Sequence, residues 1–316
     1  MKYVPFGRTG IRVSQLCLGT MTFGKEADEA TSVKIMDRAL DVGINFFDTA
    51  NVYNNGLTEE IIGRWMGPHR ESIILASKAH FPTGDGPNER GSSRRNITLS
   101  VEKSLKRLGT DWLDVLYLHR WDDETAIEES LEALGDLIAR GKVLYAAVSN
   151  FAAWQTMKAL GVAAMASRAA TITAIQPMYN LVKRQAEVEI LPQAQAEGLA
   201  VCPYNPLAAG LLTGKYQQGQ SGRLHESDMY KERYKSQQYW TVAEAFAGYA
   251  REHGYSPAAL AVAWVASHPA VTAPILGARS LEQLNDTLGC LDIELDQQAR
   301  ATVSALSIDP PLATDR

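Results

Sequence analysis

Short apolar runs alternate with longer amphipathic segments along most of the chain. Eight of the runs have the length and composition of buried strands, and they lie at Gln15–Gly19, Ile44–Phe47, Ile73–Ala76, Val115–Leu118, Tyr145–Val148, Thr171–Ile175, Leu199–Cys202 and Val271–Ile275. They recur at a steady spacing, except for a long gap before the last run. The pattern predicts eight strands separated by helices.

The segments between the runs carry apolar residues at helical spacing and end in glycine. Glycine favours a helix end because it adopts the left-handed backbone conformation at no steric cost. The three clearest cases are Val33–Leu40 before Gly43, Val101–Leu108 before Gly109, and Ile127–Ile138 before Gly141. Helix starts are indicated at Ser256-Pro257 and by a capping box at Ser280–Gln283.

Eight strand–helix units in one chain predict a (β/α)8 barrel. The first 14 residues, MKYVPFGRTGIRVS, read as a hairpin that could plug the bottom of the barrel. The gap between Ala208 and Pro269 requires an extra loop, and extra helices are expected before and after the last strand. A doubly wound open sheet is the alternative fold, but no GxGxxG follows the first strand. No linker divides the chain, so we expect a single domain at 1–316.

Composition narrows the class of partner. The 316 residues are 46 % hydrophobic and 21 % charged, and the net charge of −5 arises from interspersed acids and bases. This balance argues against a nucleic acid or membrane partner and favours a small molecule. The N-terminus lacks the apolar core of a signal peptide, so a cytoplasmic protein is expected. Both a monomer and a homo-oligomer are compatible with the sequence.

The cysteines do not indicate a metal or disulfide site. Cys17, Cys202 and Cys290 are odd in number, far apart and flanked by apolar residues, with no ligand spacing. We expect them to be reduced packing residues.

Polar side chains follow most of the predicted strands. In a barrel the carboxyl ends of the strands meet at one mouth, where function is located. The residues at these ends are Asp48, Lys78, His119, Ser149, Asn150, Gln176, Tyr204 and Asn205. Any one of them could be a helix cap or a solvated loop residue. An acid, a lysine and a histidine on three consecutive strands together indicate a reactive site.

Together with Tyr53, the residues Asp48, Lys78 and His119 suit acid–base catalysis. A phenol has a pKa near 10, so it needs a neighbouring cation to act as an acid–base catalyst near neutrality. Lys78 could supply that cation, and Asp48 could hold the lysine charged and oriented. His119 would then hydrogen-bond the reacting oxygen. The set suits protonation of a carbonyl oxygen as a hydride reaches its carbon.

Several motifs in order resemble the aldo-keto reductase superfamily over essentially the whole chain. They are LGTMTFG at 18–24, DTANVY at 48–53, ASK at 76–78, LYLHRWD at 116–122, VSNF at 148–151, QPMYN at 176–180, YNPLAAGLLTGKY at 204–216 and PILGARSLEQLND at 274–286. The resemblance implies the barrel fold with its N-terminal hairpin. It also implies a catalytic tetrad of Asp48, Tyr53, Lys78 and His119, with the tyrosine as proton donor.

The same resemblance implies NADPH as cofactor, bound without a Rossmann domain, with NADH as a weaker alternative. Ser149, Asn150 and Gln176 would hold the carboxamide, Tyr204 would stack on the nicotinamide, and Gln283, Asp286 and Thr287 would contact the adenine end; many relatives have asparagine where this chain has Thr287. Gly277 and Arg279 lie before a helix start, a good site for the 2′-phosphate. The remaining implied contacts are Gly19, Thr20, Met21, Asp48, Asn205, Pro206, Leu207, Ala208, Gly210, Lys215 and Arg223.

The substrate pocket is expected to be apolar and suited to aldehydes or aromatic ketones. Its expected lining is Met21, Phe23, Tyr53, His119 and Trp121. The insertion at 217–240 resembles the branch that includes the potassium-channel beta subunits and many bacterial reductases. Two alternatives follow: a redox-sensing module that binds nicotinamide with incidental turnover, and a Schiff-base aldolase that uses Lys78.

Overall fold

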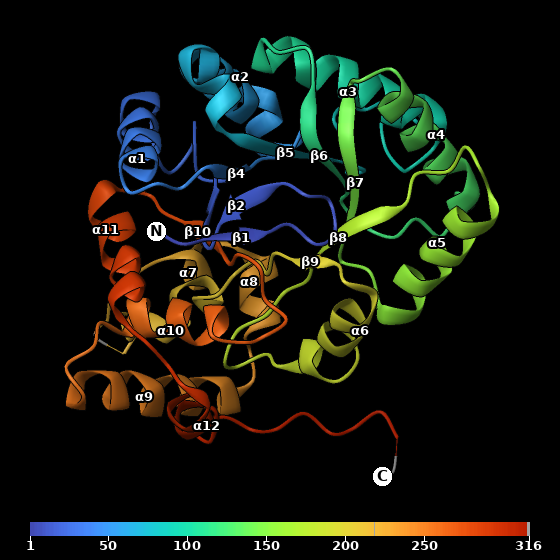
Figure 1. Ribbon diagram of the computed structural model, residues 1–316. Helices are drawn as coiled ribbons and strands as arrows, with labels where there is room; N and C mark the ends of the chain where they lie inside the picture. The colour runs from blue at the N-terminus through green and yellow to red at the C-terminus, as the bar shows by residue number, and fades with distance from the viewer. Residues whose placement is uncertain (218, 315–316) are drawn as a thin grey trace.

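The inner layer of the molecule is a sheet of eight parallel strands, seen in a computed structural model that describes residues 1–217 and 219–314 (Figure 1). Position 218 of the expected insertion and the last two residues of 1–316 lie outside the described residues. The strand order is β10-β3-β4-β5-β6-β7-β8-β9. The strands are β3 Cys17–Gly19, β4 Phe46–Asp48, β5 Ile74–Ala79, β6 Leu113–Leu118, β7 Val143–Ser149, β8 Ile172–Gln176, β9 Ala200–Val201 and β10 Ile275–Gly277. The predicted (β/α)8 barrel is confirmed.

The barrel closes between β9, its shortest strand, and the chain that enters β10. The amides of Thr272 and Ala273 donate to the Val201 carbonyl at 2.8 and 3.3 Å, and the Ile275 amide donates to the Pro203 carbonyl at 2.9 Å. Two prolines at this seam, Pro203 and Pro274, have no amide to donate, so the ladder is irregular. The predicted last strand, 271–275, is therefore wrong in its bounds: this segment closes the barrel, and the regular strand begins where it ends.

The N-terminal hairpin lies against the bottom of the barrel, as predicted. Strand β1 (Tyr3–Pro5) pairs antiparallel with β2 (Arg12–Ser14). Phe6 is fully buried and meets Phe46 of β4 edge to face, with ring centroids 5.6 Å apart. An added Cβ at Gly7 would lie 2.9 Å from the Thr173 carbonyl oxygen, so the hairpin turn touches the start of β8 directly.

Helices form the outer layer of the barrel (Figure 1). The helices up to β9 are α1 Glu29–Asp41, α2 Leu57–Met66, α3 Arg94–Leu108, α4 Ile127–Ala139, α5 Ala153–Met165 and α6 Ile190–Glu197. Between β9 and β10 lie α7 Arg223–Glu226, α8 Asp228–Arg233, α9 Gln237–Glu252 and α10 Pro257–Ala266, and after β10 lie α11 Leu281–Leu288 and α12 Gln297–Ser304. The expected extra helices on both sides of the last strand are present. Among the described residues, no helix is both long and apolar enough to cross a membrane.

The helix ends follow the sequence signals with one exception. Gly43, Gly109 and Gly141 all have positive φ, as predicted for helix stops. Ser256 and Ser280 cap α10 and α11 by accepting from amides in the first turn. The capping box is only half formed, because the Gln283 side chain accepts from the Arg279 amide at 3.0 Å rather than from the cap residue.

The bottom of the barrel contains a buried ion pair between Arg70 and Asp114. Their charged atoms are 2.8 Å apart, and each side chain is 9 % exposed. Asp114 also accepts from the Leu75 amide at 2.9 Å, and Arg70 donates to the Trp112 carbonyl at 3.0 Å. All partners are protein groups at the starts of β5 and β6, so this pair fastens the two strands together. The three cysteines are buried and free, as predicted.

Candidate active site

The mouth of the barrel brings Asp48 and Lys78 together from adjacent strands. Lys78 is fully buried, and its Nζ donates to Asp48 Oδ1, to the Thr49 carbonyl at 2.8 Å and to Tyr53 Oη at 3.3 Å. Strand β5 continues to Ala79, so Lys78 lies within the strand rather than at its end. The ammonium group therefore connects a carboxylate to a phenol.

A strained turn delivers the phenol of Tyr53. The residues that follow it, Asn54 and Asn55, have φ of 48° and 56°, in the left-handed region. The Asn54 amide donates to the Phe23 carbonyl at 2.7 Å, which ties the turn to the loop after β3. Such backbone strain persists only where surrounding contacts enforce it, and it is concentrated at functional sites.

The buried acid Glu59 of α2 links the tyrosine turn to the lysine strand. Ser77 Oγ donates to Glu59 Oε1 at 2.7 Å, and Arg107 of α3 lies 2.7 Å from the other carboxylate oxygen. Helix α2 starts directly after the turn of Tyr53, whereas Ser77 precedes Lys78. The link thus fixes the distance between the two groups that form the phenol–ammonium contact.

The protonation states suit a proton donor. Burial alone lowers the pKa of Lys78, but Asp48 and Tyr53 outweigh burial and the pKa is raised, so the amine stays charged. Burial raises the pKa of Tyr53 more than Lys78 lowers it. Lys78 is the neighbouring cation that was predicted and its charge lowers the pKa of Tyr53, but burial outweighs that effect. The phenol keeps its proton at neutral pH.

His119 lies beside the phenol as a neutral imidazole. Its ring centroid is 6.1 Å from that of Tyr53 and 4.7 Å from that of Phe81. Burial, with smaller effects of Lys78 and His80, holds the pKa of His119 well below its usual range. Its Nδ1 is buried without a hydrogen-bond partner among the described residues, as is Thr49 Oγ1 nearby. Unsatisfied buried polar atoms are rare in proteins, and these lie at the strand ends.

Side chains from β7, β8 and β9 complete the wall of the mouth. Gln176 donates to Asp48 Oδ2 at 2.9 Å, and Tyr204 donates to Asn150 Oδ1 at 2.7 Å. Asn150, with φ of 56°, donates to the His119 carbonyl at 2.9 Å. Ser149 Oγ donates to the Gln176 carbonyl at 3.0 Å. All of the predicted strand-end residues except Asn205 therefore belong to one connected hydrogen-bonded network.

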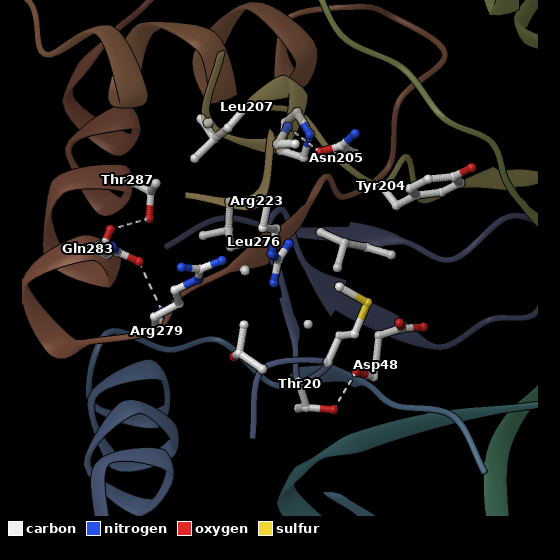
Figure 2. Close-up of a pocket in the computed structure, with 18 of the residues that line it drawn as sticks. Thr20, Asp48, Tyr204, Asn205, Leu207, Arg223, Leu276, Arg279, Gln283 and Thr287 are labelled. Atoms are coloured by element: carbon white, nitrogen blue, oxygen red, sulfur yellow. Dashed lines mark hydrogen bonds between the residues drawn. The ribbon is translucent and has the colours of Figure 1, made fainter. Parts of the chain in front are cut away.

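One large cavity of about 1690 Å³ opens over this network. Pockets for a single small ligand usually hold about 300–1,000 Å³, so the space accommodates more than one compact molecule. Figure 2 shows Asp48 and Tyr204 toward one side, Gln283 and Thr287 on α11 toward the other, and Arg223 between them. The predicted residues that line the cavity are Gly19, Thr20, Met21, Asp48, Tyr53, His119, Ser149, Asn150, Gln176, Tyr204, Asn205, Pro206, Leu207, Gly210, Lys215, Arg223, Gly277, Arg279, Gln283, Asp286 and Thr287.

Sequence comparison decides the family. Residues 15–308 match the Aldo/keto reductase family. The chain belongs to this family.

Several relatives match this aldo/keto reductase along nearly its whole length. The uncharacterized oxidoreductase YrpG of Bacillus subtilis strain 168 is 44 % identical over 94 % of this chain and 93 % of its own. A probable voltage-gated potassium channel subunit beta from Oryza sativa subsp. japonica is 37 % identical over 93 % of this chain and 92 % of its own. A putative aryl-alcohol dehydrogenase of Schizosaccharomyces pombe is 32 % identical over 94 % of this chain and 93 % of its own. The protein is thus an oxidoreductase of a family that uses NAD(P)H and acts on small molecules.

Besides Lys78, which is fully buried in β5 and contacts the lining residues Asp48 and Tyr53, three predicted site residues do not line the cavity. Phe23 is fully buried in the core. Trp121 turns away and packs on Phe151 and Trp154, with centroids 5.3 and 5.5 Å apart. Ala208 is fully buried beneath its own loop. Each residue lies in a loop after a strand, where the direction of a side chain depends on packing that the sequence pattern does not encode.

Other residues that line the cavity could not be predicted from the strand-end pattern. Phe81 lies three positions after Lys78, and this spacing alone could have suggested a place above the mouth. Among the others are Arg120 after β6 and Met229, Tyr230 and Arg233 on α8. Residues 229–233 lie in the insertion, whose folding back over the mouth has no periodic signal.

The loop after β9 is strained and fixed by side chains. Asn205, Ala208 and Ala209 have φ of 64°, 50° and 58°. Asn205 Oδ1 accepts from the Ala209 amide at 2.7 Å, and its amide donates to the Tyr234 hydroxyl at 2.6 Å. These bonds hold a conformation that non-glycine residues rarely adopt.

Cations gather along the arm of the cavity next to α11. Arg279 Nη2 lies 3.1 Å from Glu226 Oε2, and Arg223 Nε lies 3.8 Å from Glu26 Oε1. Burial, followed by Arg279, lowers the pKa of Lys215. These three cations repel one another, so an anion placed among them would be stabilised. Thr287 Oγ1 donates within α11, to the Leu284 carbonyl at 2.8 Å.

Proposed function

We propose that this protein is an NADPH-dependent reductase of aldehydes or ketones, acting as one domain at 1–316 with Tyr53 as the proton donor. The observation that carries the proposal is the contact of Tyr53 Oη with the buried, Asp48-paired Lys78 Nζ, at 3.3 Å on the wall of the cavity. His119 on the same wall is the third group suited to a carbonyl oxygen. NADH is proposed as the weaker cofactor.

The donor set of the cavity fits a phosphorylated dinucleotide. Its volume suits a long ligand, and Lys215, Arg223 and Arg279 supply positive charge along one arm. Arg279 would bind the 2′-phosphate beside the start of α11, since guanidinium groups and helix N-termini both favour phosphate. Ser149, Asn150 and Gln176 would hold the carboxamide, and Tyr204 would stack on the nicotinamide. When bound, the cofactor supplies the hydride.

The protein groups then provide the proton and orient the carbonyl. The neutral imidazole of His119 donates a hydrogen bond to the carbonyl oxygen without adding charge. Tyr53 gives its phenolic proton to that oxygen, and Lys78 stabilises the phenolate left behind. Because the pKa of Tyr53 is raised, the acid form needed for reduction persists through neutral pH. The reverse oxidation requires the phenolate and is favoured at alkaline pH.

Tyr53→Phe tests the assignment of the proton donor. We expect kcat to fall by about 10²–10⁴-fold, the usual contribution of general acid catalysis, while NADPH binding is nearly unchanged. Binding is measured by fluorescence titration, and turnover by NADPH absorbance with 4-nitrobenzaldehyde. Tyr145→Phe is the matched control, because the Tyr145 hydroxyl bonds the Thr9 carbonyl at 3.4 Å in the hairpin region. Unchanged turnover in Tyr53→Phe would contradict the assignment.

A nicotinamide-binding regulatory module is the second candidate. The observation in its favour is the 37 % identity to a relative named as a probable potassium channel subunit beta. Tight NADPH binding by the wild type without turnover of any aldehyde tried would favour it. The aldolase alternative is disfavoured, because a Schiff base requires a neutral amine and the pKa of Lys78 is raised.

A further inference from the structure

The lining of the cavity is more basic than the protein as a whole. Its cations are Lys215, Arg120, Arg223, Arg233 and Arg279, and its acids are Asp48, Glu282 and Asp286. The whole chain carries a net charge of −5. Of the acids, Asp48 is neutralised by Lys78, while Glu282 and Asp286 belong to α11. The reaction end of the cavity, where Tyr53 and His119 lie, therefore has a surplus of positive charge.

The arginines of the lining fall into two groups by their partners. Arg223 and Arg279 have Glu26 and Glu226 within ion-pair distance. Neither Arg120 nor Arg233 has a carboxylate within 4.0 Å in the part of the chain that the structure describes. The first group belongs to the arm assigned above to the cofactor phosphates. The second group has no assigned counter-charge.

Arg233 belongs to the reaction end rather than to the phosphate arm. Its guanidinium carbon lies 5.3 Å from the ring centre of Tyr230, a residue that is 8 % exposed, and that of Arg223 lies at 5.9 Å from the same ring, so Tyr230 separates the two groups of arginines. Burial raises the pKa of Tyr204 overall, and the charge of Arg233 lowers it. The charge of Arg223 instead lowers the pKa of Lys215. Helix α8 thus holds a half-buried cation on the cavity wall that Tyr204 and Tyr230 also line.

We propose that Arg233 binds an anionic group on the substrate, so that the preferred substrates are aldehydes or ketones that carry a carboxylate, with Arg120 as a second cation at the rim. This inference rests on the proposed reductase function. A guanidinium fork matches a carboxylate geometrically, and charge-assisted hydrogen bonds of this kind are stronger than neutral ones. A basic cavity in an acidic protein also steers anionic molecules toward it.

A pair of shape-matched substrates isolates the charge. 4-Carboxybenzaldehyde and 4-nitrobenzaldehyde have similar outlines, but only the first carries a negative charge. The quantity measured is kcat/KM for the carboxylate divided by kcat/KM for the nitro compound. In Arg233→Leu we expect this ratio to fall by about 10–100-fold, the usual effect of a lost charge-assisted bond. Arg233→Lys keeps the charge without the fork and should fall between the leucine variant and the wild type.

Lys231→Leu is the matched control. It removes one positive charge from the same helix, but Lys231 is 52 % exposed and pairs with Asp228 away from the cavity. Its ratio should equal that of the wild type. An equal fall in Lys231→Leu would mean that the net charge of the protein, not Arg233, sets the preference, and would overturn the proposal.

The remaining outcomes separate this proposal from the function on which it rests. If the wild type reduces neither aldehyde, the proposed function fails. If it reduces both and Arg233→Leu leaves the ratio unchanged, the reductase stands and the anion site is overturned. NADPH titration of each variant confirms that the comparison is made on folded protein.

Discussion

Among the described residues, the bottom of the barrel uses glycine alone where the backbone must adopt positive φ, whereas the mouth uses asparagine and alanine as well as glycine. At the bottom, the turns that lead from helix to strand use glycine, at Gly43, Gly109, Gly141 and Gly198. The non-glycine residues with positive φ in the described chain all follow strands at the mouth: Asn54, Asn55, Asn150, Asn205, Ala208 and Ala209. Glycine makes such turns without strain, whereas other residues store it. The bottom is built for stability, and the mouth retains strain where its side chains are needed.

The two buried ion pairs differ in the same way. Arg70–Asp114 at the bottom is surrounded by backbone groups of β5 and β6. Lys78–Asp48 at the mouth instead shares its ammonium group with Tyr53, which faces the cavity. Burial of charge therefore does not by itself mark a catalytic site. A third, reactive partner distinguishes the mouth pair from the bottom pair.

The strongest test of this contrast replaces one acid at each end. Asp114→Asn leaves Arg70 buried without its counter-charge, and we expect it to lower the free energy of unfolding by about 3–5 kcal/mol while kcat/KM of the folded protein is retained. Asp48→Asn should abolish most turnover as well as lowering stability. Urea unfolding and aldehyde reduction are measured for both variants. Loss of turnover in Asp114→Asn at a temperature where it is folded would break the distinction.

A second test removes a partly exposed cation at the mouth, where we expect a loss of cofactor binding rather than the loss of stability expected for the buried pair at the bottom. Arg279→Ala should weaken NADPH binding by about 1.5–3 kcal/mol, the value of a charge-assisted contact, and NADH binding much less. Its pair with Glu226 is partly exposed, so the free energy of unfolding should change by at most about 1 kcal/mol. Equal losses of NADPH and NADH affinity would show that Arg279 does not read the 2′-phosphate.

The smallest expected effect concerns backbone strain. Gly109 has φ of 64° and open space around an added Cβ, so Gly109→Ala tests strain alone. We expect it to lower the free energy of unfolding by about 1 kcal/mol. Ala209→Gly at the mouth relieves strain of the same kind and should leave stability unchanged or raised. Changes of the same sign in urea unfolding would show that the ends do not differ in stored strain.

The sequence predicted the parts of the molecule that repeat. Strand ends recur in register around a barrel, so Asp48, Lys78 and His119 could be brought together from their positions alone. The hairpin and the helix caps could be predicted because their signals are local. The directions of Phe23 and Trp121 could not, because loop side chains follow packing, and neither could the return of α8 over the mouth.

Two further features, the bounds of the last strand and the net pKa shift of Tyr53, could not be predicted from the sequence for physical reasons. The last strand was misplaced because an apolar run shows burial but not which residues can donate, and Pro274 interrupts the ladder there. The motif identifies the cation beside Tyr53, but it does not give the net direction of the pKa shift, because burial outweighs that neighbour. Burial depends on the whole fold, so a motif of four residues does not reveal it.

The irregular seam between β9 and β10 affects how the protein moves. Strands joined by few amide donors open at lower free energy than a complete ladder, so amide hydrogen exchange should be fastest here within the sheet. Two segments leave this seam and line the cavity: Tyr204–Asn205 and Gly277–Arg279. The barrel is therefore most easily opened beside the site through which a large ligand must enter and leave, while β4, β5 and β6 hold the reactive groups in place.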